Sequence, residues 1–332
     1  MRVFSGIQPS GKLHLGNYAG AVKSWLEYQK NNIDAIYSIV DLHAITVWQD
    51  PQLLRDATYN LYADLLALGL KEEKSTIFVQ SHVSQHLQLA WILSSVARIG
   101  WLNRMVNFKD KSGKNREKAS VGLYIYPILQ AADILLYKAD EVPVGEDQRQ
   151  HIELARDIAT KFNKDYGVDF FKVPEIKLQQ NAYKIMSLKN VENKMSKSDS
   201  SQNGVIYFSD TNDMLAKKIA KSTTDSLPFP EDDSQLNDRL AVKNLMNIYS
   251  LVTECNYSEI MIKYGGMSFK QFKDDLTELL IKFISPVREL SSEICKDHEF
   301  IDNKLSVAKE KVSDIACETL DEVTNIVGFI KE

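Results

Sequence analysis

The chain has 332 residues, a length that predicts two domains of about 150 residues each. Apolar residues make up 44% of the chain and charged residues 26%, proportions typical of a globular protein rather than of a disordered or membrane-spanning one. The net charge of −5 argues against a protein that binds nucleic acid with its whole surface. Glycine and proline, with 14 and 8 residues, are scarce, which predicts long helices and tight connections.

Cysteine spacing and the lack of a targeting signal favour a cytoplasmic protein. Cys255, Cys295 and Cys317 are far apart and form no C-x-x-C pair, so we expect neither a disulfide framework nor a structural zinc site. No apolar stretch reaches the roughly 18 residues that are needed to cross a bilayer. Residues 1–6 lack the apolar core of a signal peptide, so we expect no membrane association.

The first forty residues predict a strand, a helix and a second strand. Residues 2–7 are typical of a buried strand, and residues 33–40 form a compact apolar run that ends at Asp41. Between them, apolar side chains recur at helical spacing from about residue 16 to Lys30. A strand–helix–strand unit of this length is typical of a parallel sheet.

Further segments extend the same pattern. Asp50 is suited to cap a helix that begins at Pro51 and ends by Gly69. Residues 76–80 and 141–144 are predicted to be a third and a fourth strand. Another helix is predicted to begin shortly after the fourth strand.

The chain changes character after about residue 187. Residues 189–203 form a polar loop, and the pattern beyond this loop is mainly helical to the end. The sequence therefore predicts an α/β domain over residues 1–187 and a helical domain over residues 188–332. The last helix can pack back on the first domain.

A short motif with a glycine follows the first strand. His14, Leu15, Gly16 and Asn17 open a helix beyond the carboxyl end of that strand, where parallel sheets place their ligands. A helix N-terminus attracts phosphate, to which His14 and Asn17 can donate, and Gly16 lets a nucleotide approach the backbone. The same residues also fit an ordinary helix start with a surface histidine.

A second motif, in the polar loop, carries two lysines three residues apart. It consists of Lys194, Met195, Ser196, Lys197 and Ser198. Lysine is a compact charge on a flexible stem, so two of them beside small hydroxyl groups are suited to clamp a mobile anion. A solvated surface loop is the alternative.

Together, HLGN (14–17) and KMSKS (194–198) resemble the two signatures of class I aminoacyl-tRNA synthetases. Four further segments resemble the tryptophanyl-tRNA synthetases of bacteria, namely FSGIQPSG (4–11), DLHAITV (41–47), AADILLY (131–137) and PVGEDQ (143–148). The similarity runs in order over nearly the whole chain. It implies a Rossmann-like, doubly wound parallel sheet in an α/β catalytic domain, followed by a mainly α-helical C-terminal domain.

The resemblance implies a two-step ligation. The carboxylate of L-tryptophan attacks the α-phosphate of ATP, which gives tryptophanyl-adenylate and pyrophosphate, and a ribose hydroxyl of tRNA(Trp) then takes the acyl group. The tyrosyl-tRNA synthetases share the fold and both signatures and are the nearest alternative. A catalytically silent paralogue that senses tryptophan or binds RNA is the other, and the intact lysine motif disfavours it because a sensor need not keep those lysines.

Asp133 is the residue that bears on the choice of amino acid. An indole N–H is only a donor, and a carboxylate in an apolar stretch is costly unless it is paired. The spacing of apolar residues around Asp133 is equally consistent with an aspartate that caps a helix or is partly exposed. In the tryptophanyl family the matching residue accepts the indole proton, so the resemblance favours tryptophan.

By the same resemblance, the indole pocket is walled by Phe4, Val40, His43, Ile134, Val142 and Val144. Tyr126 and Gln148 are implied to hold the ammonium or carboxylate of the substrate. Gln130 stands where the usual bacterial pattern has methionine, and its amide can reach Asp133 or a water molecule. We therefore expect a pocket that is not purely apolar opposite the carboxylate.

The nucleotide is implied to lie between two sets of residues. One set is Gln8, Pro9, Ser10, Gly16 and Asn17, and the other is Gly145, Glu146, Asp147 and Ile185, with the lysine motif closing over them. Lys111, Lys194 and Lys197 are implied to neutralise the departing pyrophosphate, with Gln8 also in the catalytic set. Mg²⁺ is expected to arrive with ATP rather than to occupy a protein cage, and His82 and His86 fit polar surface or core positions better than metal ligands.

Two basic segments are candidates for binding tRNA although the net charge of the chain is negative. Residues 104–118 contain six basic and two acidic side chains, and Lys217, Lys218 and Lys221 form a second basic cluster. The first segment is suited to the acceptor end of tRNA and the helical domain to the anticodon. A homodimer is expected from the resemblance alone.

Overall fold

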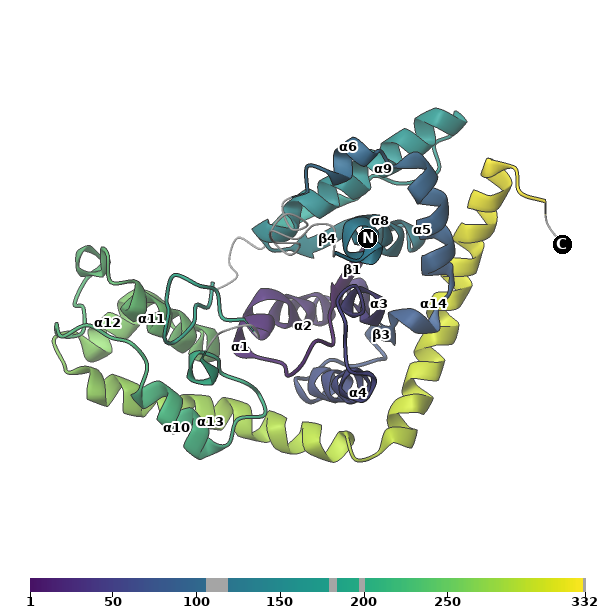
Figure 1. The fold of residues 1–332 in the computed structure, drawn as a ribbon. Helices are drawn as coiled ribbons and strands as arrows, with labels where there is room; N and C mark the ends of the chain where they lie inside the picture. The colour runs from purple at the N-terminus through teal and green to yellow at the C-terminus, as the bar shows by residue number, and fades with distance from the viewer. Residues whose placement is uncertain (106–118, 179–183, 197–200, 331–332) are drawn as a thin grey trace.

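Within the part of the chain that the structure describes, parallel strands form one sheet in the order β3-β2-β1-β4-β5 (Figure 1). β1 (Arg2–Ile7) lies at its centre, with β2 (Asp34–Ile39) and β3 (Ser75–Val79) on one side and β4 (Glu141–Val144) and β5 (Glu175–Leu178) on the other. The chain winds outward from β1 in both directions, which confirms the predicted Rossmann-like, doubly wound fold. This computed structural model describes residues 1–105, 119–178, 184–196 and 201–330.

Helices make up most of the remaining described chain, with short π or 3-10 turns labelled η. In chain order they are α1 (Leu15–Asn17), η1 (Tyr18–Val22), α2 (Lys23–Lys30), α3 (Asp41–Ala44), α4 (Pro51–Ala67), η2 (Gln80–His82), α5 (Gln85–Val96), α6 (Ile99–Leu102), α8 (Val121–Leu136), η4 (Glu146–Gln148), α9 (Arg149–Tyr166), η5 (Gln202–Gly204), α10 (Asn212–Ala220), η6 (Asp233–Leu236), α11 (Leu240–Thr253), α12 (Tyr257–Tyr264), α13 (Phe269–Ile294) and α14 (His298–Val327). The lengths of α13 and α14, 26 and 30 residues, agree with the scarcity of glycine and proline.

Successive residues of the central strands serve two different cores. Val3 and Ala35 pair in register and face a core shared with α2 and α4, whereas their neighbours Phe4 and Ile36 face a core shared with α5, α8 and α9. Alternate side chains of a strand point to opposite faces, so helices cover both faces of this sheet. Burial on both faces is typical of parallel sheets.

The predicted elements of the α/β part lie close to their expected bounds. Helical residues run without interruption from Leu15 to Lys30, with a π turn in the middle. Asp50 caps α4 through two backbone N–H groups, and Gly69 follows the helix with φ at +105°. The sequence analysis missed β5, because its EIKL sequence is short and has only two apolar residues.

The C-terminal helices pack along the sheet unit (Figure 1). α13 contacts α4 and α10, and α14 then returns beside α5 and β3. Ala308, Val312 and Ala316 of α14 are buried in the core that contains α5 and α8. The core that contains Val3 and Ala35 also contains residues of α11 and α13. The predicted division into two domains at residues 187/188 stays a prediction. No helix of the described residues is long and apolar enough to span a membrane.

Candidate active site

The carboxyl ends of the central strands meet at one edge of the sheet, and predicted site residues follow each of them. Gln8 and Ser10 follow β1, Val40 follows β2, and Gly145 follows β4. The strand order reverses between β1 and β4, and open parallel sheets bind ligands in the crevice at such a point. The fold therefore brings the predicted nucleotide and amino-acid residues to the same edge.

The two signature motifs lie against each other. Two backbone hydrogen bonds join residues 13–15 to residues 206–208, which follow the lysine motif, with N···O distances of 2.9 and 3.1 Å. At Gly16, a Cβ atom would lie 3.1 Å from the carbonyl oxygen of Met195. Glycine allows this close approach without displacing the loop. HLGN and the described part of KMSKS thus form one continuous surface.

His14 holds the start of the first helix. Its Nδ1 accepts the Asn17 N–H (3.2 Å), and Asn17 Oδ1 accepts the His14 N–H (3.3 Å), which makes a reciprocal capping box. The ring is buried at 4% exposure, so the alternative of a surface histidine is wrong. Because Nδ1 is an acceptor here, a donation from His14 to phosphate must come from Nε2, and that contact stays a prediction.

The described part of the lysine motif is anchored on the helical half of the chain. Met195 N donates to Ile185 O (3.0 Å), which brings two predicted nucleotide residues together, both of them buried. Asn244 of α11 accepts the Met186 N–H (2.8 Å) and donates to the Met186 carbonyl (2.9 Å). Three predicted site residues lie outside the described part of the chain, namely Lys111, Lys197 and Ser198.

Lys194 pairs with Asp147 at the predicted nucleotide site. Lys194 Nζ lies 2.9 Å from Asp147 Oδ1, and both side chains are about half exposed. Burial raises the pKa of Asp147, but hydrogen bonds from Lys194 and Gln148 outweigh it and hold the pKa below its usual range. An exposed ion pair contributes at most about 1 kcal/mol, so an incoming phosphate can replace Asp147 as the partner of Lys194.

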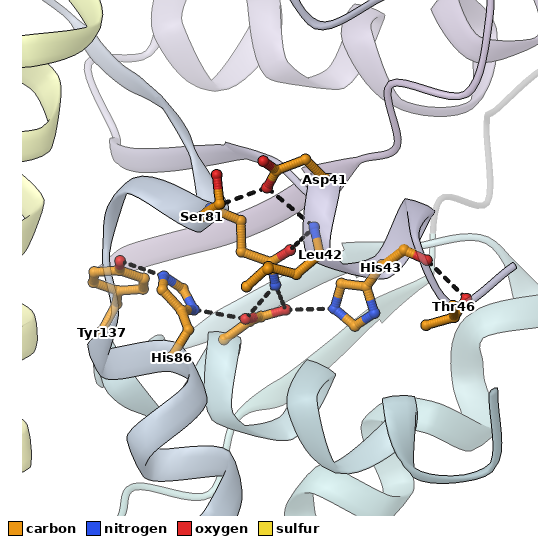
Figure 2. A network of polar contacts seen from close by, with 9 residues as sticks. Asp41, Leu42, His43, Thr46, Ser81, His86 and Tyr137 are labelled. Atoms are coloured by element: carbon orange, nitrogen blue, oxygen red, sulfur yellow. Dashed lines mark hydrogen bonds and ion pairs between the residues drawn. The ribbon is translucent and has the colours of Figure 1, made fainter. Parts of the chain in front are cut away.

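Asp133 lies in α8, and its carboxylate contacts both His43 and His86, which are labelled in Figure 2. It is 1% exposed. His86 Nδ1 lies 2.6 Å from Oδ1 and His43 Nε2 lies 2.7 Å from Oδ2. Gln80 Nε2 lies 2.8 and 2.9 Å from the two oxygens. Donors from α5, α3 and η2 therefore converge on one carboxylate.

Two of these donors are also held on their far side. Gln80 Oε1 accepts the Leu42 N–H (3.2 Å), and His86 Nε2 lies 2.8 Å from the Tyr137 hydroxyl (Figure 2). A carboxylate only accepts, so Gln80 Nε2 and His86 Nδ1 both donate to it. Burial raises the pKa of Tyr137, so its hydroxyl keeps its proton at neutral pH.

The charge of Asp133 follows from these contacts. Burial raises the pKa of the carboxyl, but the hydrogen bonds and charges of His43 and His86 outweigh burial and hold the pKa well below its usual range. Asp133 is therefore ionised at neutral pH. The four contacts use the roughly four lone-pair positions of a carboxylate, so a ligand N–H must exchange with one of the present donors.

Aromatic rings line the space beside this network. Phe4 stacks on Tyr137 with ring centroids 5.5 Å apart, and His43 stands edge-on to Tyr126 at 6.0 Å. The Tyr126 hydroxyl lies 2.7 Å from His151 Nε2. The buried members of the predicted pocket are Phe4, Val40, His43, Tyr126, Ile134 and Val142, and the half-buried ones are Gln130, Val144 and Gln148.

The amide that reaches Asp133 belongs to Gln80, whereas the sequence analysis placed the amide of Gln130 on Asp133 or on a water. His43, Gln80 and His86 already surround both carboxylate oxygens, which leaves no acceptor position for Gln130. Gln130 is half-buried on the same helix. The pocket therefore has the expected polar amide beside Asp133, but this amide belongs to Gln80 and not to Gln130.

Gln80 and His86 were not among the predicted site residues. Gln80 directly follows β3, and its position at the carboxyl end of a predicted strand was a signal that sequence reasoning did not use. His86 is a buried core residue, one of the two positions expected for it, but nothing in its spacing indicated a contact with Asp133. His82 is exposed and precedes α5, so the two histidines do not share a helix face.

Lys218 is not part of a basic surface, which corrects the cluster predicted at residues 217–221. The residue is 3% exposed and pairs with Asp210, which is 1% exposed. Helical periodicity explains the difference, because Lys218 lies on the inner face of α10 with Leu215 and Ile219.

Comparison with known proteins identifies the family. Residues 1–285 match the class I tRNA synthetases for tryptophan and tyrosine (W and Y), and the chain belongs to this family. A tryptophan–tRNA ligase from Caulobacter vibrioides is 47% identical over 329 residues, which cover 99% of this chain and 95% of that protein.

Solved structures of similar proteins agree in fold over the full length. The tryptophanyl-tRNA synthetase of Mycoplasma pneumoniae has a TM-score of 0.89 at 32% identity and covers 99% of this chain and 98% of its own. That of Campylobacter jejuni, complexed with ADP and tryptophan, has a TM-score of 0.84 at 34% identity and covers 99% of this chain and 100% of its own.

Proposed function

We propose that this chain is a tryptophan–tRNA ligase, which activates L-tryptophan with ATP and transfers it to tRNA(Trp). The observation that carries the proposal is the buried, ionised carboxylate of Asp133, because a buried indole N–H needs an acceptor. A tyrosine hydroxyl is also a donor, so the carboxylate alone does not separate the two amino acids. The similar proteins from Caulobacter vibrioides and Campylobacter jejuni handle tryptophan, which favours tryptophan.

In the proposed amino-acid site, the indole N–H exchanges with one donor of Asp133. His43 is the best candidate, because within the described residues its ring makes one hydrogen bond, whereas Gln80 and His86 are held at both ends. Tyr126 and Gln148 hold the ammonium or carboxylate of the substrate. The apolar walls are Phe4, Val40, Ile134, Val142 and Val144, with Gln130 beside them.

In the proposed nucleotide site, ATP lies in the crevice between the ends of β1 and β4. The complex of the Campylobacter jejuni relative with ADP supports a nucleotide in this fold. Mg²⁺ arrives bound to the phosphates of ATP, since it keeps several waters and prefers substrate phosphates to an all-protein cage. The proposed contacts are Gln8, Pro9, Ser10, Gly16, Asn17, Gly145, Glu146, Asp147, Ile185, Met195, Ser196 and Ser198.

The first step needs no protein nucleophile, because the tryptophan carboxylate itself attacks the α-phosphate. Catalysis then rests on positioning and on stabilising charge as it develops on the phosphates. Lys194 leaves Asp147 for the departing pyrophosphate, and Lys111 and Lys197 act with it. Asp147, once released, accepts a ribose hydroxyl, and Gln8 completes the catalytic set.

In the second step, a ribose hydroxyl at the end of tRNA(Trp) attacks the adenylate and takes the tryptophanyl group. The six basic side chains of residues 104–118 are suited to the phosphates of the acceptor end, although residues 106–118 lie outside the described part of the chain. The helical half of the chain is proposed to bind the anticodon. Because charged tRNA serves protein synthesis, we place the reaction in the cytoplasm.

We also propose a homodimer through the outer faces of α5, α6 and α8. Leu87, Trp91, Ile99 and Val121 lie on these helices and are each more than half exposed, with Trp91 at 76%. Large exposed apolar groups of this kind mark interaction surfaces. A second copy of the chain covers them symmetrically in a two-fold dimer.

Charging of tRNA tests the complete function. Purified protein, ATP, Mg²⁺, labelled tryptophan and unfractionated bacterial tRNA should give acid-precipitable tryptophanyl-tRNA, and labelled tyrosine should give none. Charging with tyrosine would favour the tyrosyl alternative. The absence of charging with either amino acid would favour a sensor or an RNA-binding paralogue.

A further inference from the structure

Lys218 and Asp210 form an ion pair inside the protein, and neither residue is assigned to a substrate above. Lys218 Nζ lies 2.8 and 2.6 Å from the two oxygens of Asp210 and donates to the Val205 carbonyl at 2.7 Å. An ammonium group has three N–H donors, and these contacts use all three.

The pair closes a tight turn over residues 205–210. Asp210 Oδ2 accepts the Tyr207 N–H (2.9 Å), and the Asp210 N–H donates to the Tyr207 carbonyl (3.1 Å). The Lys218 ammonium lies 4.9 Å from the centre of the Tyr207 ring. Arg288 of α13 donates to the Asp210 carbonyl, so α10 and α13 both hold the turn.

This turn is hydrogen-bonded to the first signature motif and follows the second one along the chain. Its residues 206–208 pair with residues 13–15 at the start of the first helix. Just before the turn, Gly204 O accepts the N–H of Leu188, which lies at the base of the lysine motif (2.9 Å). A displacement of the turn therefore changes the position of HLGN relative to Lys194.

The energetics of the pair favour a role in position over one in stability. Taking two charges out of water costs about as much as their attraction returns, and an apolar pair of similar volume is often equally stable. An apolar pair, however, has no donors or acceptors for the Val205 carbonyl and the Tyr207 N–H. The polar pair determines the register of the turn.

We propose that Lys218 and Asp210 are positioning residues for amino-acid activation, which hold the turn 205–210 so that Lys194 faces a nucleotide bound at HLGN. This inference rests on the proposed function, because it concerns the placement of Lys194 in that reaction. Lys218 touches no substrate and acts through the backbone of the turn.

A kinetic double-mutant cycle between Lys218→Met and Lys194→Ala tests the proposal in the full chain. The readout is kcat for tryptophan-dependent ATP–pyrophosphate exchange. A misplacement of 1 Å can lower a rate by about 100-fold, so Lys218→Met alone should lower kcat by about tenfold or more. In the Lys194→Ala background, the same change should lower kcat by less than about twofold, because the lysine that it misplaces is gone.

Two further variants separate positioning from folding. Lys218→Met leaves the Asp210 carboxylate buried without its cation, whereas Lys218→Met/Asp210→Leu removes both charges and should melt at a higher temperature than Lys218→Met and be folded under assay conditions. The proposal predicts that this folded double variant still loses kcat. Arg239→Met is the matched control and should keep wild-type kcat, since Arg239 pairs with Asp225 in the helical half, away from both motifs.

Two kinetic results would overturn the proposed positioning role of Lys218 and Asp210. Additive losses from Lys218→Met and Lys194→Ala, or full kcat in the folded Lys218→Met/Asp210→Leu variant, would reduce the pair to a purely structural role. Wild-type protein without tryptophan-dependent exchange would instead overturn the proposed function, and the inference with it.

Discussion

Replacing Asp133 with alanine perturbs the proposed amino-acid site at its centre. A hydrogen bond to a charged group contributes about 1.5–3 kcal/mol. That free energy corresponds to about a 10- to 150-fold change in affinity. Because the indole N–H loses its acceptor while the nucleotide site is untouched, KM for tryptophan should rise by this factor and KM for ATP by less than about twofold.

The same substitution should also destabilise the fold. Gln80 and His86 are fully buried and would each lose the acceptor for an N–H group. An unsatisfied buried donor costs about 1–3 kcal/mol, against a total stability of about 5–15 kcal/mol for a typical protein. Asp50→Ala is a useful control, because it removes the cap of α4, costs about 1 kcal/mol and leaves the pocket intact.

The assay is ATP–pyrophosphate exchange, with tryptophan varied at saturating ATP and ATP varied at saturating tryptophan. Circular dichroism and urea unfolding show whether the variant is folded under assay conditions. An unchanged KM for tryptophan in folded Asp133→Ala protein would refute the acceptor role. An equal rise in both KM values would also refute it, because a selective contact cannot affect the two substrates alike.

Three further predictions concern other parts of the molecule. Lys194→Ala should lower kcat for adenylate formation by about 100-fold without weakening tRNA binding in a filter assay, and an effect on tRNA binding alone would show that the lysine is not a phosphate clamp. The depressed pKa of Asp133 contributes stability that is fully present above its unfolded value of about 3.9 and is lost as the pH falls below it. The difference in unfolding free energy between wild type and Asp133→Asn should therefore stay constant from about pH 7 to pH 5 and shrink as the pH falls below about 4, and a difference that stays constant down to the lowest pH at which both proteins fold would contradict the ionised state. Trp91→Asp should convert the dimer to monomers in light scattering, and a dimer that persists would exclude the α5 face.

Regular patterns made much of the fold predictable. The apolar runs of β1 and β2, and the Asp50 cap and Gly69 stop of α4, each follow from a local rule that the structure obeys. β5 was not predictable in the same way, because a short edge strand with alternating charged residues lacks the apolar signal of its neighbours. The sequence analysis predicted only that the last helix can pack back on the first domain. It did not predict that α14 lies beside α5, because tertiary packing leaves no local signal in the sequence.

The sequence predicted two residues of the Asp133 network, but it did not predict the two other residues that complete it. Resemblance supplied Asp133 and His43, and the structure places them 2.7 Å apart. Gln80 and His86 complete the network from elements 47 residues or more away along the chain, a distance that no periodicity spans. Lys218 shows the opposite error, since a run of lysines suggested a surface whereas one of them is buried against Asp210.

The central claim is that this chain selects and activates tryptophan, and amino-acid-dependent ATP–pyrophosphate exchange tests it most directly. Wild-type protein should catalyse exchange with L-tryptophan and show none above background with L-tyrosine. Exchange with tyrosine but not with tryptophan would contradict the claim, and so would the absence of exchange with either amino acid.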